Sequence, residues 1–364
     1  MIRTEKSLVL VVLICCMCQL AQAQDTIAPR LIWAVNKVDL GTVLEEQGPQ
    51  LAEFHFTHTQ DSLFYIETVV TDCGCTTVDY TQDTLQVGES GTLRVSFDPS
   101  SGAGLFSRMI VVKGNLFGVQ DTLYIEGNAI PRASDPGGTY RTRKGDLGFR
   151  LPKVNVGEVF TNEPKLKQVE VYNFGDKPFY KDSLDYTGPE YIVVSQLTDS
   201  IMPNDRGLLQ VLYDGSEKND LGYFEDEVSL NWQDSTTFIQ LEVLADVFEY
   251  YAPFAKDNLN LVPQLVVEPK EIDLKTIKST AVQVEHVVFS NRGKQVLEIK
   301  KVQGNCECLK LELPKTTLDP GESIQLKVVF DPKGRKGIDQ RNIYVFSNDP
   351  VNPVQMFLLK SRVE

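Results

Sequence analysis

Four cysteines have the spacing best suited to chemistry in this chain. They form two Cys-x-Cys motifs, Cys73-Gly74-Cys75 and Cys306-Glu307-Cys308. On a strand, residues i and i+2 face the same side with α carbons about 6.5–7 Å apart, at or beyond the usual reach of a disulfide. A bridge within one pair therefore needs a local turn. Gly74 permits such a turn through a positive φ or a bulge, and Glu307 makes it harder.

Four chemistries are open for Cys73, Cys75, Cys306 and Cys308. The pairs could brace strand ends as structural disulfides or buried thiols, and an oxidising compartment favours bridging. A bridge between the two pairs would require their domains to dock side by side. Thiolates suit a soft metal such as Cu(I), and a strained, exposed disulfide suits redox exchange. The usual redox signature, C-x-x-C on a helix, is absent from the sequence.

The three histidines add little to these possibilities. His55 and His58 lie three apart on a predicted strand, so we expect them on opposite faces, as ordinary surface or capping residues and not as metal ligands. His286 has no Cys or His beside it. The sequence has no G-x-S-x-G, H-E-x-x-H, phosphate-loop or G-x-G-x-x-G motif. We therefore expect no catalytic residues, no cofactor and no confident metal site.

Composition limits the class of protein. The 364 residues include 36 Lys+Arg and 50 Asp+Glu, which gives a net charge of −14 and disfavours a general nucleic-acid binder. Apolar residues make up 42% and charged residues 24%, as in ordinary globular proteins. The length suggests two or three domains.

The N-terminus has the features of an export signal. Arg3 and Lys6 precede an apolar run, Leu8–Cys18, that is too short to span a bilayer. Ala21-Gln22-Ala23 then forms a cleavage site, so we expect residues 1–23 to be removed and Gln24 to become the N-terminus. Ile14, Cys15 and Met17 precede the three cysteines of this segment, where a lipoprotein signal usually has other, small residues, so lipidation is disfavoured. The sequence predicts export to the periplasm or cell surface, without a transmembrane segment.

The chain contains an internal repeat. Residues 73–99 and 306–332 each contain Cys-x-Cys, Gly-Glu-Ser and Phe-Asp-Pro, all at one offset of 233 residues. Asn115 and Asn348 share this offset. Asp39-Leu40-Gly41 corresponds to Asp273-Leu274-Lys275 with a shift of one residue. We infer two copies of one domain.

A weaker third copy without cysteine lies between these two. Residues 156–159 resemble residues 40–43, and residues 169–175 resemble residues 287–293. Leu208–Asp214 occupies the place of the strand before Asp98.

Short alternating runs with regular turns predict an all-β chain of three tandem immunoglobulin-like β-sandwich domains after the signal peptide. The predicted domains are 31–132, 148–248 and 266–364, with linkers at 133–147 and 249–265. The aromatic run Phe248–Phe254 should pack between the second and third domains. The glycine-containing stretches after each Phe-Asp-Pro, 102–106 and 334–337, should be hairpin loops.

The motifs resemble a known family. Cys73-Gly-Cys-Thr76, followed by Gly-Glu-Ser-Gly at 88–91 and Phe-Asp-Pro at 97–99, is similar to the exported bacterial domain of unknown function 1573, which is common in Bacteroidetes and related to Hydin-type (ASH) immunoglobulin-like domains. The resemblance is specific over 40–130 and looser over 266–360, where Glu307 and Leu309 replace Gly and Thr. It implies an immunoglobulin-like sandwich and secretion, and it implies no established reaction.

We therefore expect a non-enzymatic, exported adaptor or scaffold. It would present loops and exposed strand edges to protein partners in the cell envelope, outer-membrane complexes among them, with strand addition as one mode. One alternative is a thiol-based redox or Cu(I)-handling protein that uses the two Cys-x-Cys motifs. A second alternative is a glycan-binding module.

Overall fold

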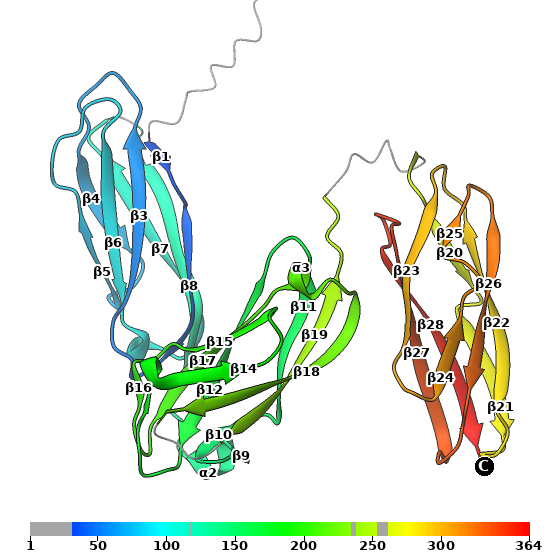
Figure 1. Ribbon diagram of the computed structural model, residues 1–364. Helices are drawn as coiled ribbons and strands as arrows, with labels where there is room; N and C mark the ends of the chain where they lie inside the picture. Colours follow the sequence, from blue (N-terminus) through cyan, green and yellow to red (C-terminus); the bar gives the residue numbers. More distant parts are fainter. Residues whose placement is uncertain (1–30, 117, 119, 234–237, 253–260) are drawn as a thin grey trace, which may run out of the picture. The chain divides into compact units, whose positions relative to one another are not determined.

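Three two-layer sandwiches make up the part of the chain that the structure describes. The computed structural model describes residues 31–116, 118, 120–233, 238–252 and 261–364 (Figure 1). Each sandwich has its own apolar core, which includes Phe54 in the first, Trp232 in the middle and Phe289 in the third. The prediction of an all-β, immunoglobulin-like fold is confirmed. The chain divides after Arg132 into two compact units, and the second unit contains the middle and third sandwiches.

The first sandwich packs sheet β1-β3-β6-β5 against sheet β2-β8-β7-β4. Alternation along β6, where Leu93, Val95 and Phe97 are buried, turns one face of each strand to the core. Its elements are β1 (Leu31–Trp33), β2 (Lys37–Leu44), β3 (Gln50–His58), β4 (Ile66–Thr71), β5 (Thr76–Tyr80), β6 (Ser90–Phe97), η1 (Pro99–Ser101), β7 (Gly104–Gly114) and β8 (Gln120–Ile130).

The third sandwich repeats this topology. Sheet β20-β22-β26-β24 faces sheet β21-β28-β27-β23-β25. The strands are β20 (Leu265–Glu268), β21 (Glu271–Ile277), β22 (Gln283–Asn291), β23 (Leu297–Gly304), β24 (Leu309–Glu312), β25 (Thr317–Leu318), β26 (Ser323–Phe330), β27 (Gly337–Ser347) and β28 (Val354–Val363).

The middle sandwich keeps the two layers and extends one of them. Its sheets are β15-β17-β12-β10-β9, β11-β19-β18-β14 and the short pair β13-β16. The elements are α2 (Pro136–Thr139), β9 (Thr142–Lys144), β10 (Leu147–Phe149), β11 (Lys153–Phe160), β12 (Lys165–Asn173), β13 (Phe179–Tyr180), η2 (Lys181–Ser183), β14 (Leu184–Thr187), β15 (Ile192–Gln196), β16 (Ser200–Ile201), β17 (Arg206–Tyr213), α3 (Gly215–Lys218), β18 (Gly222–Trp232) and β19 (Ile239–Phe248).

The segment 133–147 is not a linker, so that prediction is wrong. It supplies α2, β9 and the start of β10 to the middle sandwich. Tyr140 is fully buried and its hydroxyl donates to the buried carboxylate of Glu170, which also accepts from Arg206 and Arg150. A buried carboxylate requires such donors, and this requirement ties the segment to the sheet. In the second expected linker, 249–265, residues 253–260 lie outside the described part of the chain, and Leu265 already begins β20.

Each sandwich has a pair of parallel strands, β2 with β8, β11 with β19 and β21 with β28, and the first strand of each pair contains the same bulge. The register shifts between Asp39 and Thr42 in β2, between Asn155 and Gly157 in β11, and between Asp273 and Thr276 in β21. In each case the Asp or Asn side chain accepts from the main-chain N–H two residues later. The repeated Asp-Leu-Gly/Lys pattern in the sequence is therefore the signature of this bulge.

The equivalent strands β3, β12 and β22 each end at a buried polar side chain that bonds to main-chain carbonyls of the following segment. Asn173 donates to the carbonyls of Lys177 (2.7 Å) and Ile201 (2.9 Å), and Asn291 donates to those of Gln295 (2.8 Å) and Leu318 (3.0 Å). In the first copy His58 takes this place, with Nε2 2.6 Å from the carbonyl oxygen of Ser62. His58 is thus a buried residue that holds the end of its strand, which fits the capping alternative and not the surface one, while His55 is exposed on the opposite face as predicted.

We predict that Asn173→Ala lowers the free energy of unfolding of the middle sandwich by about 2–4 kcal/mol, because it leaves the buried carbonyl of Ile201, the partly buried carbonyl of Lys177 and the N–H of Gly175 without their partner. Denaturant unfolding followed through Trp232 in a Trp33→Phe background measures this change. The matched control is Asn162→Ala, at an exposed position in the same sandwich, which should change the value by less than about 0.5 kcal/mol. Equal stability of the two variants would refute the assigned role.

Candidate functional site

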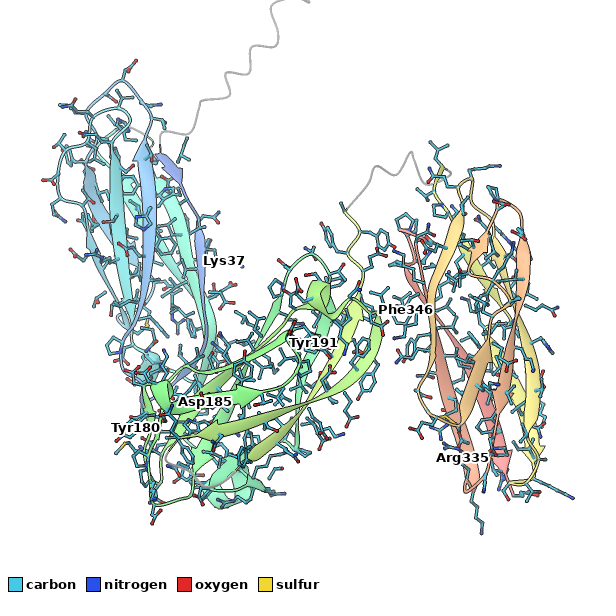
Figure 2. All side chains as sticks on the ribbon, in the orientation of Figure 1. Lys37, Tyr180, Asp185, Tyr191, Arg335 and Phe346 are labelled. Carbon is cyan, nitrogen blue, oxygen red and sulfur yellow. A yellow bond between two sulfur atoms is a disulfide. The ribbon has the colours of Figure 1, made fainter. Side chains whose placement is uncertain are left out.

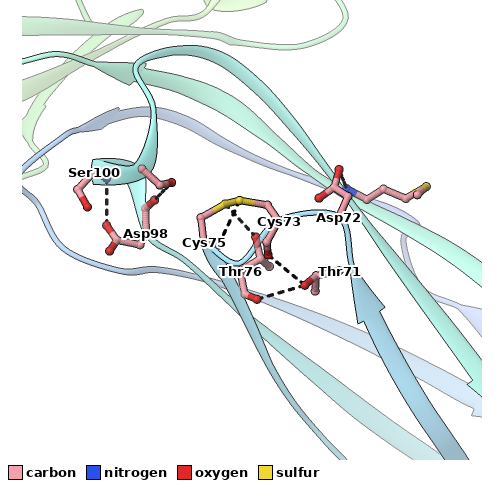
Figure 3. The surroundings of a disulfide bond; sticks show 9 residues. Thr71, Asp72, Cys73, Cys75, Thr76, Asp98 and Ser100 are labelled. Atoms are coloured by element: carbon pink, nitrogen blue, oxygen red, sulfur yellow. Dashed lines mark hydrogen bonds between the residues drawn. A yellow bond between two sulfur atoms is a disulfide. The ribbon is translucent and has the colours of Figure 1, made fainter.

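The cysteine pairs lie where the chain crosses from one sheet to the other. Cys73–Cys75 connects edge strand β4 to edge strand β5, and Cys306–Cys308 connects β23 to edge strand β24. In the structure each pair is joined internally, with the α carbons 5.2 Å apart in both copies. Figure 3 shows the first bridge in its turn.

Main-chain hydrogen bonds hold both turns in the same form. The N–H of Thr76 donates to the carbonyl of Cys73 (3.2 Å), and the N–H of Asp98 donates to that of Cys75 (2.9 Å; Figure 3 labels these residues). In the third sandwich, Leu309 and Asp331 donate in the same way to Cys306 and Cys308, at 3.3 and 2.9 Å. The structure thus supplies the local turn that an internal bridge needs.

The residue between the cysteines matters less than the sequence suggested. Neither Gly74 nor Glu307 has a positive φ, and an added Cβ at Gly74 would meet no atom within 4 Å. Glu307 therefore fits the same turn with its side chain exposed. The expectation that Glu307 hinders the bridge is wrong, because the turn lies in a backbone region open to any L-residue.

The middle sandwich forms this turn without cysteine. Ile192 donates to the carbonyl of Pro189 (3.0 Å), and Asp214 donates to that of Tyr191 (2.9 Å), which repeats both bonds of the cysteine copies. Pro189 and Tyr191 take the places of the two cysteines. The Tyr191 hydroxyl is anchored by Asp226 and Lys218. The turn therefore forms without cysteine, and a bridge between the cysteines crosslinks a backbone conformation that the main-chain hydrogen bonds already hold.

Within the described residues, no group of three or more His, Cys, Asp or Glu side chains could hold a metal ion. His286 is exposed on β22. The predicted cleavage residues Ala23 and Gln24 lie outside the part of the chain that the structure describes. No helix among the described residues has the length and apolarity needed to span a membrane.

A second feature, which the sequence did not reveal, adjoins the first cysteine turn. Strand β7 runs from Gly104, but β4 pairs with it only as far as Ile110, and Asp72 closes the ladder on Met109. Since main-chain groups alternate in direction, those of Leu105 and Ser107 point away from β8, past the end of β4. Among the described residues no strand pairs with this side of β7. The Leu105 side chain is 90% exposed.

The third sandwich has the same open edge 233 residues later. Strand β23 pairs with β27 only as far as Ile343, and Asn305 bonds to Asn342. The main-chain N–H and C=O groups of Ile338 and Gln340 point away from β28, beyond the end of β23. The Ile338 side chain is 79% exposed. Gly104 and Gly337, predicted to lie in hairpin loops, are the first residues of these strands, with φ of 101° and 84°.

In the middle sandwich the corresponding edge is occupied. Gly222, with φ 114°, and Tyr223 begin β18 as Gly104 and Leu105 begin β7. The Tyr223 N–H donates to Gln303 Oε1 (2.9 Å), and Gln303 Nε2 donates to the Tyr223 carbonyl (2.9 Å). The side-chain amide of the third sandwich thus pairs with this edge as the peptide group of a neighbouring strand would.

A groove of about 1010 Å³ lies beside this contact in the second unit. Among the described residues that line it, no side chain is basic. Its acidic residues are Glu158, Glu225, Asp246, Glu249 and Glu307. Its aromatic residues are Phe160, Tyr223, Phe248, Tyr344 and Phe346, the last labelled in Figure 2. The pKa of Asp246 is raised above its usual value, mainly by burial and to a smaller extent by the negative charge of Glu158.

The strand order and paired sheets define an immunoglobulin-like β-sandwich protein. The chain belongs to the family described as "Protein of unknown function (DUF1573)", which matches residues 31–129 and 265–363, more than half of the sequence. A comparison with curated proteins gave no match.

Three solved structures illustrate the likeness. A protein of unknown function from Porphyromonas gingivalis W83 aligns with 60% of this chain and 100% of its own, at 13% identity and a TM-score of 0.47. Titin domains I67–I69, in an E-to-A mutated variant, align with 93% and 99% at 9% identity and a TM-score of 0.19. The ASH/PapD-like domain of human CEP192 aligns with 32% and 93% at 9% identity and a TM-score of 0.22. Likenesses this weak say nothing about function.

For the cysteines, we predict that peptide mapping without reduction finds each pair bridged internally and closed to alkylation. Cys73→Ser/Cys75→Ser should lower the free energy of unfolding of the first sandwich by only about 1–2 kcal/mol, because the bridge closes a very short loop. Trp33 fluorescence in a Trp232→Phe background reports this transition, and reduced protein without the Ser substitutions is the control. Free thiols in the native protein, or loss of the folded first sandwich, would contradict the assignment.

For Asp246, we predict that Asp246→Asn stabilises the middle sandwich at pH 7. Folding raises the pKa of this carboxyl group, so its charged form costs folding free energy above the folded pKa. The gain should fade as the pH falls below the unfolded pKa of about 3.9, where the proton is bound in both states. Denaturant unfolding at pH 7 and at a pH below about 3.9 measures the gain in stability. Asp185→Asn, at an exposed position on β14 (Figure 2), is the control. A gain of the same size at both pH values would exclude this cause.

Proposed function

We propose that this chain is a non-enzymatic, exported adaptor that binds extended segments of protein partners along the open edges of its first and third sandwiches. The main-chain groups of Leu105 and Ser107, and of Ile338 and Gln340, would pair with the added strand. The observation that supports this most directly is the contact between Tyr223 and Gln303. There an amide group already occupies the equivalent edge, through one donated and one accepted hydrogen bond.

The side chains at these edges favour an added strand. Leu105 and Ile338 are 90% and 79% exposed, where solvated edges more often carry charged residues that discourage pairing. Covering such a side chain contributes about 1.5–3 kcal/mol, and each main-chain hydrogen bond adds about 0.5–1.5 kcal/mol. One edge alone therefore supports weak binding. Two edges on one chain raise the affinity for a partner, or an assembly, that reaches both.

The cysteine turns support this function structurally. Each turn lies directly after the strand whose early end leaves the edge open, and a bridge there holds that end in place. Internal bridges suit an oxidising compartment, in agreement with the predicted cleavage between Ala23 and Gln24 and with export to the periplasm or cell surface. A pair of cysteines already joined to each other offers no thiolate to Cu(I), so the adaptor role accounts better for these residues.

We predict that Leu105→Lys/Ile338→Lys abolishes capture of protein partners from envelope extracts, measured by quantitative mass spectrometry after crosslinking. A charged side chain at an open edge opposes strand pairing without disturbing the ladder on the other side. Tyr124→Lys is the matched control. It places the same charge on β8, where the main chain is paired to both β2 and β7.

Hydrogen exchange on the complex then separates the possible modes. The proposal requires that the partner slows exchange at the amides of Leu105 and Ser107, or of Ile338 and Gln340. Partners lost equally from the Tyr124→Lys control, or bound without protection of these amides, would overturn it. A second copy of this chain as the protected partner would identify self-association as the use of the edge.

A further inference from the structure

The groove of the second unit has a row of polar side chains across three strands. Glu158 on β11 lies directly opposite Asp246 on β19, and Asp246 lies opposite Tyr223 on β18. Two carboxylates in directly opposed positions repel each other and destabilise a sheet. The row therefore holds negative charge at a cost in folding free energy.

Neither carboxylate is paired with a basic side chain in the part of the chain that the structure describes. Glu225 is paired with Lys153, and Glu249 with Lys300, so these two acidic groups of the groove are compensated. In the described residues no ion pair reaches Glu158 or Asp246. The ammonium group of Lys165 donates to the main-chain carbonyl of Glu158 and not to its carboxylate.

Aromatic rings lie beside the acidic row. Phe160 is opposite Phe248 with ring centroids 6.0 Å apart, and Phe248 stacks on Phe346 at 6.2 Å (Phe346 is labelled in Figure 2). Phe160 and Tyr223 remain 41% and 48% exposed. Carboxylates beside exposed ring faces are the surroundings that an ammonium or guanidinium group prefers.

We propose that this groove binds a basic segment of a protein partner, with a Lys or Arg side chain lying against Phe160 and Tyr223 and its cation between Glu158 and Asp246. A volume of about 1010 Å³ holds several residues of an extended segment and not one side chain alone. An acidic segment would be repelled, and an uncharged apolar segment would bury two unpaired carboxylates. This site is separate from the strand edges of the proposed function, because the cation is held by side chains and not by the main-chain groups of Leu105, Ser107, Ile338 or Gln340.

The test measures binding of fluorescent peptides to the full-length chain by anisotropy. An Arg/Gly peptide is compared with Ser/Gly and Glu/Gly peptides of the same length. Glu158→Gln/Asp246→Asn should weaken binding of the Arg/Gly peptide about tenfold or more, since charge-assisted hydrogen bonds are lost. Relief of the repulsion keeps this variant folded, so loss of binding does not reflect unfolding. Phe160→Leu, which keeps an apolar side chain but removes the ring, should weaken binding several-fold.

Asp61→Asn/Glu67→Gln is the matched control, because it removes two exposed negative charges from the first sandwich. It should leave the affinity unchanged. The proposal is overturned if the Arg/Gly peptide binds no more tightly than the Ser/Gly peptide, or if the control loses as much affinity as the groove variant. Unchanged binding by Phe160→Leu would also overturn it, since the cation would then lie elsewhere. None of these outcomes depends on Leu105 or Ile338, so the adaptor proposal stands or falls separately.

Discussion

The hydrogen-bonding groups at the edges of its β-sheets constrain this protein more than any other feature. A buried or paired main-chain group is stable, and an edge group needs water or a substitute partner. The chain uses side-chain amides as such substitutes. Asn115 pairs with Tyr65 and Leu63, and Asn348 pairs in the same way with Glu298 and Val296. This is why the two asparagines recur at one offset in the sequence. The side-chain amide of Gln303 pairs in the same way with the main chain of Tyr223, from one sandwich of the second unit to the other.

The crossover turn has the same main-chain hydrogen bonds in all three copies, but different side chains stabilise it. The crossover turn keeps the same two hydrogen bonds whether its flanking residues are Cys73 and Cys75 or Pro189 and Tyr191. A disulfide reduces the freedom of the unfolded chain, and proline does so by fixing φ. Tyr191 adds a hydroxyl held by Asp226 and Lys218. The same turn therefore forms with a Cys pair in two copies and with Pro189 and Tyr191 in the middle copy.

The two cysteine-containing copies have diverged in their cores next to the open edges. Phe106 of the first copy is buried and stacks on Phe97 with ring centroids 4.2 Å apart. The corresponding residue of the third copy is Asp339, also buried and held by Arg335 and Arg341; Figure 2 labels Arg335. The apolar and the ionic solution each support a strand with an exposed Leu or Ile.

The sequence by itself determined the features that neighbouring residues create. Alternation, turn residues and the repeated motifs predicted three all-β copies. The repeated Asp-Leu-Gly/Lys pattern aligned two of these copies, and only the structure showed that it forms a bulge. Tertiary structure decided the rest. Segment 133–147 became part of a sheet because Tyr140 could reach Glu170, 30 residues away. Tyr223 and Gln303 are 80 residues apart and meet only because two sandwiches pack together. Where β4 ends, which edge stays open and which carboxylates face each other depend on the register of distant strands. No local pattern encodes that register, because the contacts that set it form only when the sheets close.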